Sequence, residues 1–431
     1  MKKIILIIIF SSFIYSSSSD ERHYNFLEKK IKSGAKNWNE LRSKVSEEHP
    51  DYLWLFNKKF DNLDFNGYNF SKILMGNCIL NNLKISNSDF NHATLKKCKI
   101  QNVNFNDSNL DNIQISKSDI NNVVFRNCTM KKIHIGWNLK NLTFINTNAS
   151  YSKFRYSGGK YIIIKRSNFK HVFFALDYIN SIFEEVDFRY STFGDYFFSF
   201  MKSRFNNVDF SYSKFSIGDL RKQSNQFKDS YLNRVKFDNC HLGMYDFKMF
   251  GNSYKYVTKF TKLLFKDTDF NEISFNKAKF DKYVEFINCS FNRTKFNGSE
   301  FITQRNKLFR NTLFKNCIFK NCEFRNIKTL NNARFVNCDF KYVEIDKKWK
   351  TNFKMKNVKN SFEITWVDAG YYKIKVNLKK LKTQIYSGKG INQSTYKNLH
   401  KYIKIIQKKY PRSYILKQAN ALIEYLEMKL F

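Results

Sequence analysis

The chain has 431 residues and carries 75 Lys and Arg against 37 Asp and Glu, which gives a formal net charge of +38 at pH 7. It contains only two Pro and 14 Gly, so disorder is excluded as the default state of most of the chain. The positive charge predicts an anionic partner or surface, and a well-solvated exterior without a partner is the alternative.

Residues 1–19 have the pattern of a secretory signal peptide. Lys2 and Lys3 precede an apolar stretch from Ile4 to Phe10, and the run from Ser16 to Ser19 supplies small residues for cleavage. The stretch is too short to span a membrane, and no cysteine is placed to carry a lipoprotein anchor. We therefore expect export to the periplasm, the cell surface or the medium, with a buried N-terminal helix as the alternative.

Residues 20–59 are predicted to form a helical N-terminal cap. A first helical segment ends at Ser33-Gly34, and a second places Trp38, Leu41 and Val45 at helical spacing before Pro50 ends it. Trp38 is expected to cover the open end of the structure that follows, because repeat arrays need their apolar ends covered.

From Phe60 to Ile135 a large apolar residue stands at every fifth position. A period of five fits neither a helix nor an alternating strand, so the chain must turn a corner every five residues. The residue two positions before each of these anchors is mostly apolar or small, which is how a narrow interior is filled. We predict an all-β solenoid. Its interior stack is predicted to include Phe65, Phe70, Phe90, Phe105, Phe125, Cys78, Cys98 and Cys128.

The same spacing continues, with slips, through residues 60–345. Runs from Phe227 to Phe247, Phe260 to Phe280 and Phe309 to Phe324 keep the period. Slips of one to three residues are interpreted as bulged corners or short excursions. The pattern is compatible with a coil of 20 residues, and at that length the tract predicts about 14 coils.

The eight cysteines share one position in the repeat, two residues before an anchor. They are Cys78, Cys98, Cys128, Cys240, Cys289, Cys317, Cys322 and Cys338. This register predicts buried thiols that act as small apolar fillers. Disulfides are the alternative, because an even count in an exported protein is typical of them. A metal site is less favoured, since no CxxC pair is present.

Residues 346–431 depart from the fivefold pattern. Apolar and polar residues alternate from Phe362 to Trp366 and from Tyr372 to Val376, and Asp368 to Gly370 between them predicts a β-hairpin. Two helices follow, divided by Pro411. The region holds 20 basic and 5 acidic residues, so it is strongly basic. It is either a C-terminal cap or a small domain that carries the activity.

The repeat tract resembles the pentapeptide repeat family, through units such as Asn102-Val103-Asn104-Phe105 and Asn87-Ser88-Asp89-Phe90, over roughly two-thirds of the chain. The resemblance implies a right-handed quadrilateral β-helix with four pentapeptides per coil. The segment from Gly34 to Arg42 is similar to a helix that often precedes such coils, which implies that Trp38 and Arg42 belong to the cap. Leu41 replaces the second aromatic of that pattern, and the heavy use of Phe implies a bulkier interior than the family's Ala and Leu.

No catalytic, cofactor-binding or metal site is predicted. His92, His134, His171 and His241 fall at outward positions several coils apart, and no nucleophile, phosphate-loop or dinucleotide motif is present. The first hypothesis is an exported, non-enzymatic scaffold that binds an anionic polymer, a membrane surface or a host protein through a basic exterior. The second is a secreted effector or toxin whose activity lies in residues 346–431.

The resemblance raises a third hypothesis. Some cytoplasmic members of the family imitate DNA and protect topoisomerase from quinolones. Those members need an acidic surface, so the net charge of +38 and the signal peptide predict that this chain is not a DNA mimic. The oligomeric state is not predicted.

Overall fold

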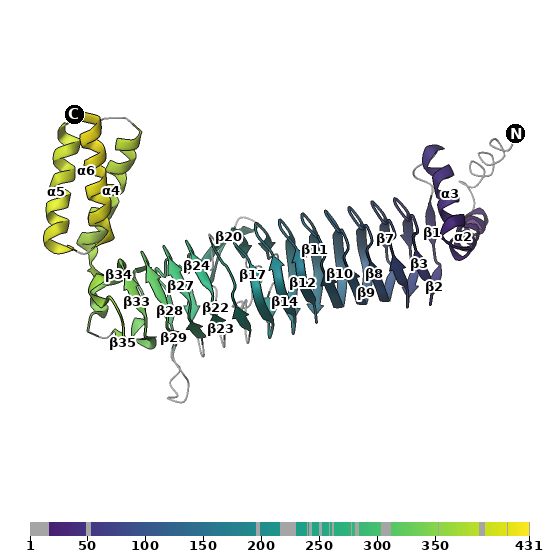
Figure 1. Ribbon diagram of the computed structural model, residues 1–431, viewed down its shortest axis with the longest axis horizontal. Coiled ribbons are helices and arrows are strands. Elements are labelled where there is room, and N and C mark those ends of the chain that lie inside the picture. Colours follow the sequence, from purple (N-terminus) through teal and green to yellow (C-terminus); the bar gives the residue numbers. More distant parts are fainter. Residues whose placement is uncertain are drawn as a thin grey trace. The chain divides into compact units, whose positions relative to one another are not determined.

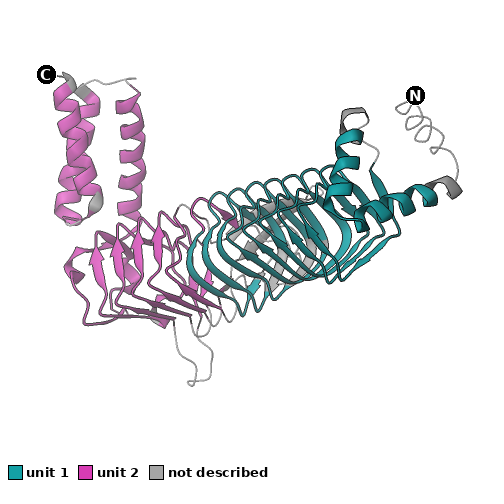
Figure 2. Ribbon diagram, turned by 45° about the vertical axis from the view of Figure 1, so that its right-hand side comes forward, with its two compact units in different colours: residues 1–209 teal, residues 210–431 magenta. Residues whose placement is uncertain are grey.

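Parallel strands wound into successive coils dominate the computed structural model, which is a parallel β-solenoid with helices at the N-terminal and C-terminal ends of the chain (Figure 1). The prediction of fold class is confirmed. The structure describes residues 17–48, 53–194, 199–215, 230–238, 240, 244–249, 252–257, 259–260, 263–276, 278–280, 284–302, 312–351, 353–387, 393–411 and 413–430. The chain forms two compact units, residues 1–209 and 210–431, each taken by itself (Figure 2).

Each coil of unit 1 takes about 20 residues, because an inward anchor pairs with the anchor four pentapeptides later. Leu55 pairs with Met75, Met75 with Leu95, and Leu95 with Ile115. The strands of this unit are β1 (Trp54–Phe56), β2 (Lys59–Asp61), β3 (Asp64–Asn66), β4 (Leu74–Gly76), β5 (Ile79–Asn81), β6 (Lys84–Ser86), β7 (Thr94–Lys96), β8 (Lys99–Asn106), β9 (Gln114–Arg126), β10 (His134–Ile145), β11 (Lys153–Lys160), β12 (Ile163–Asn168), β13 (Phe173–Ile179), β14 (Ile182–Asp187), β15 (Thr192–Phe193), β16 (Ser199–Met201) and β17 (Arg204–Asp209).

The corners are made by the residue two positions after each anchor, which takes a left-handed backbone conformation. Asn82, Asn102 and Asn122 have φ of 53°, 53° and 54°. Asn tolerates this region better than most residues, which explains its frequency in the repeat. Asn122 also donates from its amide nitrogen to Asn102 Oδ1 at 2.8 Å, and Asn102 donates in the same way to Asn82 at 3.0 Å. The corner residues therefore form a ladder along the coils.

Two helices cover the first coils, α2 (Ser17–Lys32) and α3 (Ala35–Glu48), with Gly34 at φ +106° between them. The predicted signal peptide falls mainly on residues 1–16, which lie outside the described residues, and Ser17 to Ser19 belong to α2. No described helix has the length and apolar character needed to cross a membrane.

Unit 2 also consists of parallel coils, with less regular spacing. Its strands and short 3₁₀ helices are β18 (Lys214–Phe215), β19 (Tyr231–Asn233), β20 (Met244–Met249), β21 (Asn252–Val257), β22 (Lys259–Phe260), β23 (Leu263–Lys266), β24 (Asp269–Asn271), β25 (Lys279–Phe280), β26 (Val284–Ile287), β27 (Ser290–Asn292), β28 (Glu300–Phe301), β29 (Thr312–Lys315), β30 (Ile318–Lys320), β31 (Glu323–Phe324), η1 (Leu330–Asn332), β32 (Ala333–Val336), β33 (Asp339–Lys341), β34 (Val343–Asp346), η2 (Lys347–Trp349), β35 (Lys354–Lys356), η3 (Ser361–Glu363) and β36 (Ile364–Val367).

One stretch of unit 2 leaves the repeat altogether. β20 and β21 pair with each other in antiparallel register, so Phe247, expected as an anchor, lies in an excursion. Leu232 consequently pairs with Phe265, 33 positions on. Residues in such excursions do not contribute to the coils, so the solenoid has about 12 turns instead of the predicted 14.

The coils also extend beyond the predicted bounds of residues 60–345. β1 already pairs with β4 before Phe60, while β35 pairs with β32 and β36 pairs with β34. Met355, which is 39% exposed, pairs with Phe335, and the half-buried Trp366 pairs with Ile345. Both follow Ile345 at intervals longer than five residues, so the spacing alone did not reveal them.

The predicted C-terminal hairpin is wrong, because its second strand is a helix. Three helices complete unit 2, namely α4 (Ala369–Tyr386), α5 (Gln393–Lys409) and α6 (Tyr414–Leu430). The carboxylate of Asp368 accepts a hydrogen bond from the backbone nitrogen of Tyr371 and so caps α4. Tyr371, Ile374 and Leu378 are buried at helical spacing, whereas Val376 is 55% exposed. The buried residues thus follow the period of a helix, and not the alternation of apolar and polar residues that predicted a strand.

Candidate functional site

The residues predicted for the interior stack lie inside the coils. Phe65, Phe70, Phe90, Phe105, Phe125, Cys78, Cys98 and Cys128 are all buried. Phe105 stacks on Phe125 with ring centroids 5.1 Å apart, and all eight cysteines are buried thiols. These side chains stabilise the solenoid and are not placed to contact a ligand.

The two residues predicted for the N-terminal cap seal the first coils. Trp38 is fully buried, packs 5.5 Å from the Phe70 ring, and donates from its indole nitrogen to the Asn69 carbonyl at 2.7 Å. Arg42 is also buried and donates to the Ser71 carbonyl at 2.6 Å. Burial lowers the pKa of its guanidinium. Both residues attach α3 to the solenoid.

The histidines are not brought together. His92, His134 and His171 are exposed on different coils, and His241 lies outside the described residues. Among the residues that the structure describes, no group of three or more His, Cys, Asp or Glu could hold a metal ion.

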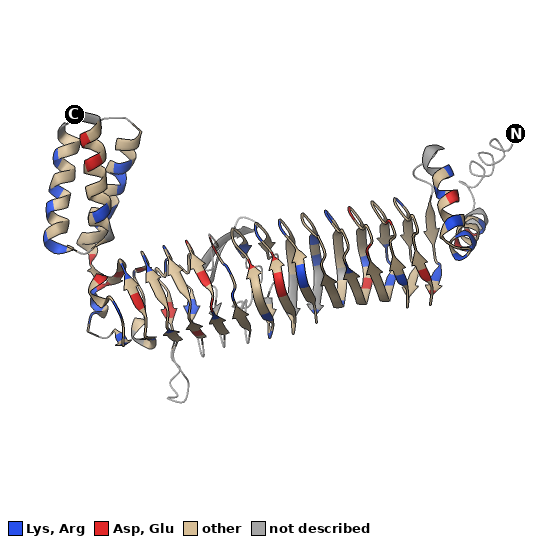
Figure 3. Cartoon of the chain, in the orientation of Figure 1, with Lys and Arg blue, Asp and Glu red and all other residues tan. Residues whose placement is uncertain are grey.

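The largest uncompensated positive charge in the C-terminal region lies on α4 and α5. Each helix contains five lysines, and neither contains Asp or Glu. Lysines run along the lengths of both helices (Figure 3). Within the described part of the chain, only Lys375 of these ten lysines forms an ion pair with an acidic side chain.

One face of α5 is a straight lysine stripe. Lys397, Lys401, Lys404 and Lys408 are spaced by four, three and four residues, so they lie on the same side of the helix, and all four are exposed. The opposite face packs into the core of the three-helix bundle through Leu399, Ile403 and Ile406, all buried. Because the apolar face is used internally, the surface that α5 presents is cationic. We call these four residues the lysine stripe.

A partly buried ionic cluster attaches α4 to the last coils. Lys375 Nζ lies 2.9 Å from Glu323 and 2.8 Å from Glu344, whose strands β31 and β34 are paired. Arg325 lies 3.0 Å from Glu323 and 3.4 Å from Glu344. Tyr371 donates its hydroxyl hydrogen to Glu344, so two carboxylates are matched by two cations and a phenol.

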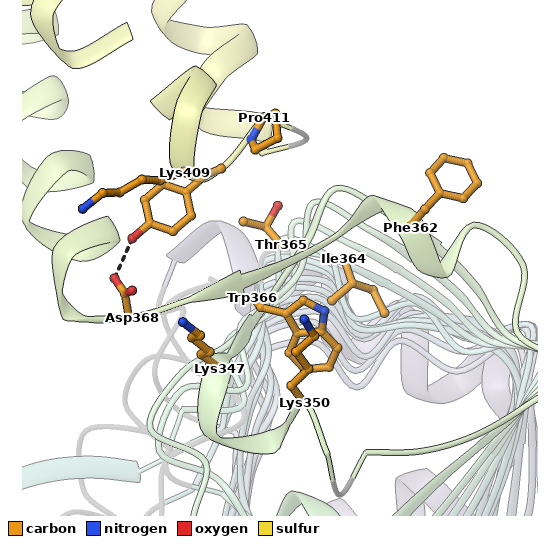
Figure 4. Close-up of a pocket in the computed structure, with 10 residues that line it drawn as sticks. Lys347, Lys350, Phe362, Ile364, Thr365, Trp366, Asp368, Lys409 and Pro411 are labelled. Atoms are coloured by element: carbon orange, nitrogen blue, oxygen red, sulfur yellow. Dashed lines mark hydrogen bonds between the residues drawn. The ribbon is translucent and has the colours of Figure 1, made fainter. Parts of the chain in front are cut away.

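A hollow of about 470 Å³ opens at the foot of the bundle, between α5 and the coil formed by η2 and β36. Its lining includes Lys347, Lys350, Lys409, Thr365, Trp366 and Tyr410 (Figure 4). The sequence did not predict this site, because its residues span more than sixty positions. The basic composition of residues 346–431 was the one available signal.

A carboxylate and a phenol close one side of the hollow. Tyr410 donates its hydroxyl hydrogen to Asp368 at 2.6 Å. This bond lowers the pKa of the Asp368 carboxyl, while burial and the carboxylate raise the pKa of Tyr410 to about 12. Asp368 is therefore a deprotonated group already engaged by hydrogen bonds.

Comparison with known proteins gives no close relative. No protein-family profile and no curated protein matches the chain. Among solved structures, HetL, a pentapeptide repeat protein involved in heterocyst differentiation regulation from the cyanobacterium Nostoc, shares 8% identity over 69% of this chain and 96% of its own, with a TM-score of 0.20. Full-length QnrB1, a plasmid-mediated fluoroquinolone resistance protein, shares 15% identity over 57% of this chain and 99% of its own, with a TM-score of 0.20.

Other solenoids also match. The catalytic domain of a GH87 alpha-1,3-glucanase in complex with nigerose shares 9% identity over 77% of this chain and 67% of its own, with a TM-score of 0.32. Scores this low support no argument about function. The parallel coils of four pentapeptides are nevertheless consistent with a pentapeptide repeat protein.

Proposed function

We propose that the protein is an exported, non-enzymatic solenoid scaffold whose C-terminal helical bundle binds an anionic polysaccharide. The observation that carries this proposal is the lysine stripe of α5, because four exposed ammonium groups follow one helix face without an acidic neighbour on α4 or α5. An extended row of like charges is suited to a polymer that carries repeated negative charges.

The solenoid exterior is a less favoured site for the same partner. Several of its cations are paired with carboxylates, including Lys165 with Glu184 at 2.8 Å and Arg293 with Glu272 at 2.8 Å. Pairs of this kind reduce the field available to a polyanion. The proposal therefore assigns the solenoid the role of a scaffold.

A membrane surface is also less favoured. A helix that lies in a membrane interface inserts its apolar face into the lipid. The apolar face of α5 is occupied within the bundle by contacts with α4 and α6, so the helix has only its polar face to offer.

The experiment measures heparin binding by the full-length protein at about 50 and about 200 mM salt. A stripe variant carries Lys397→Gln, Lys401→Gln, Lys404→Gln and Lys408→Gln. A matched control removes four exposed lysines of unit 1, through Lys72→Gln, Lys97→Gln, Lys117→Gln and Lys132→Gln. We expect wild-type binding to weaken steeply with salt, the stripe variant to lose at least about tenfold in affinity, and the control to lose about threefold or less.

Two results would contradict the proposal. Equal losses in the stripe and control variants would show that charge over the whole chain attracts the polymer. Binding to vesicles that contain anionic phospholipid, without binding to heparin, would identify a membrane surface as the partner.

A further inference from the structure

We propose that the hollow at the foot of the bundle binds one sugar-sized ring that carries a phosphate or sulfate group. This inference rests on the proposed function and refines it, since such a ring is a unit of an anionic polysaccharide. The hollow has a volume of about 470 Å³, within the usual range of small-molecule sites.

Three lysines supply the charge that such a group requires. Lys347 and Lys350 lie at the two ends of the η2 segment, and Lys409 is the last residue of α5. None of the three forms an ion pair with an acidic side chain in the described part of the chain. Asp368 is the one acidic residue of the lining, and it already accepts hydrogen bonds from Tyr410 and from the Tyr371 backbone. The lining therefore carries a net positive charge toward a ligand.

A hydroxyl without a partner points to a ligand independently of the charge. Thr365 is only 5% exposed, and its hydroxyl oxygen has no hydrogen-bond partner. A buried polar atom left unpaired is unfavourable, so such atoms are rare in folded proteins. Figure 4 shows this hydroxyl on the side of β36 that faces Pro411, across the hollow. This oxygen has almost no accessible surface in the free protein, so a ring hydroxyl would satisfy it once the lining moves to admit the ring.

The rest of the lining is suited to the apolar face of a ring. Trp366 and Ile364 lie on the side of β36 away from Thr365 and Pro411, so the lining extends along both sides of this strand (Figure 4). Aromatic and aliphatic walls with a few placed polar groups are typical of sites for small ligands. The ammonium group of lysine binds phosphate as a single point charge, so the three lysines of the lining are suited to a phosphate group.

A second hollow, of about 420 Å³, adjoins the first and gives room for a neighbouring unit of a polymer. The two share Phe362 and Pro411, and the second adds Lys417 and Asn420 of α6. Phe362 is 56% exposed at the boundary between them. A chain whose charged ring occupies the first hollow can therefore continue across Phe362 into the second.

The test uses isothermal titration calorimetry with the full-length protein. The probes are glucose 6-phosphate, glucose 6-sulfate, glucose and inorganic phosphate. We expect at least one charged sugar to bind at least ten times more tightly than glucose and inorganic phosphate, and the two charged sugars distinguish a phosphorylated from a sulfated source. Lys350→Gln with Lys409→Gln should weaken this binding at least tenfold. The control, Lys379→Gln with Lys382→Gln on exposed positions of α4, should change it less than twofold.

Thr365→Val gives a second and sharper readout. Because the hydroxyl has no partner in the free protein, its removal should leave the melting temperature unchanged or raise it, yet weaken binding of the charged sugar about fivefold. Unchanged affinity in this variant would overturn the inference. So would equal binding of inorganic phosphate, or equal losses in the two double-lysine variants.

The proposed function and this inference fail in different ways. If heparin binds but no charged sugar does, the hollow is not the site and the lysine stripe still acts. If a charged sugar binds and heparin does not, the polysaccharide proposal fails while the hollow remains a site for a small ligand.

Discussion

The hydroxyl of Tyr371 lies 2.6 Å from Oε1 of Glu344, and this hydrogen bond joins the first turn of α4 to strand β34. Tyr371 is fully buried, and burial together with the carboxylate raises the pKa of its phenol well above the ordinary value. The phenol therefore stays protonated and remains a donor at any physiological pH.

Tyr371→Phe should destabilise unit 2 by about 1.5–3 kcal/mol, because a hydrogen bond to a charged group is lost while Glu344 stays buried. Tyr386→Phe is the matched control, since Tyr386 lies on the same helix and is 57% exposed. Chemical denaturation followed by circular dichroism measures both. A control that loses as much as Tyr371→Phe would contradict a specific role for the Glu344 bond.

Acid should weaken the attachment of α4 to the coils. Burial raises the pKa of Glu323, but the charges of Lys375 and Arg325 outweigh it, so the pKa lies below its ordinary value. A carboxyl with a lowered pKa stabilises the folded state above its unfolded pKa of about 4.3, and this contribution is lost as the pH falls through the folded pKa.

The measurement compares the denaturation midpoints of the wild type and Glu323→Gln from about pH 7 to about pH 3. We expect the variant to be less stable at pH 7 and to respond less to acid below about pH 5. Parallel curves for the two proteins would exclude Glu323 as a source of the acid sensitivity.

Because of the corner ladder, we expect the substitution of Asn102 by Gly to cost less stability than its substitution by Ala. Its φ of 53° disfavours a residue with a Cβ, and its amide joins Asn82 and Asn122. Asn102→Ala should cost about 1–2 kcal/mol, because Ala must adopt the left-handed region. Asn102→Gly should cost less, since Gly enters that region freely, and thermal melts would show the ranking. An Ala variant more stable than the Gly variant would mean that this corner relaxes out of the left-handed region.

The repeat register was predictable because one position in five must face the interior whatever the other four contain. That requirement placed Phe65, Phe105 and the cysteines correctly without knowledge of how the coils pair. The same reasoning failed at the predicted hairpin, because Ile374 fits both the alternating pattern of a strand and the buried face of α4. Asp368, as the cap of that helix, was the residue that distinguished the two.

The hollow could not be predicted from spacing. Thr365 and Lys409 approach it only because β36 pairs with β34 and α5 ends at that coil. Neither residue belongs to a motif, and an unpaired hydroxyl is a property of packing that no sequence pattern records. The lysines of α4 and α5, in contrast, were visible as composition, although the helical arrangement of α4 was not.

The thiols should be unreactive in the folded protein and countable in the unfolded one. Burial raises the pKa of Cys128 to about 11 and that of Cys322 to about 12, well above the value of about 8.5 for a free thiol. Iodoacetamide should therefore label Cys128 and Cys322 slowly at about pH 8, and the burial of the other six thiols should limit its access to them. Titration in denaturant without reductant should give close to eight thiols, and a count of four or fewer would indicate disulfides.

Loosening the N-terminal cap should affect more than the contacts of the cap itself, because the cap covers the first coil and keeps it from other chains. Trp38 fills the space over Phe70 and donates to the Asn69 carbonyl, so Trp38→Ala leaves both a cavity and an unpaired acceptor. About 3–5 kcal/mol is typical for the loss of a buried Trp side chain. Once α3 loosens, strand edges and apolar anchors at the first coil become accessible to other chains.

We therefore expect Trp38→Ala to lower the melting temperature and to shift the protein toward larger species in size-exclusion chromatography with light scattering. Phe26→Ala is the control, since Phe26 lies on α2 and is 44% exposed. Its melting and elution should match the wild type. If Trp38→Ala melts earlier but elutes as the wild type does, α3 still covers the first coil, and Trp38 contributes packing alone.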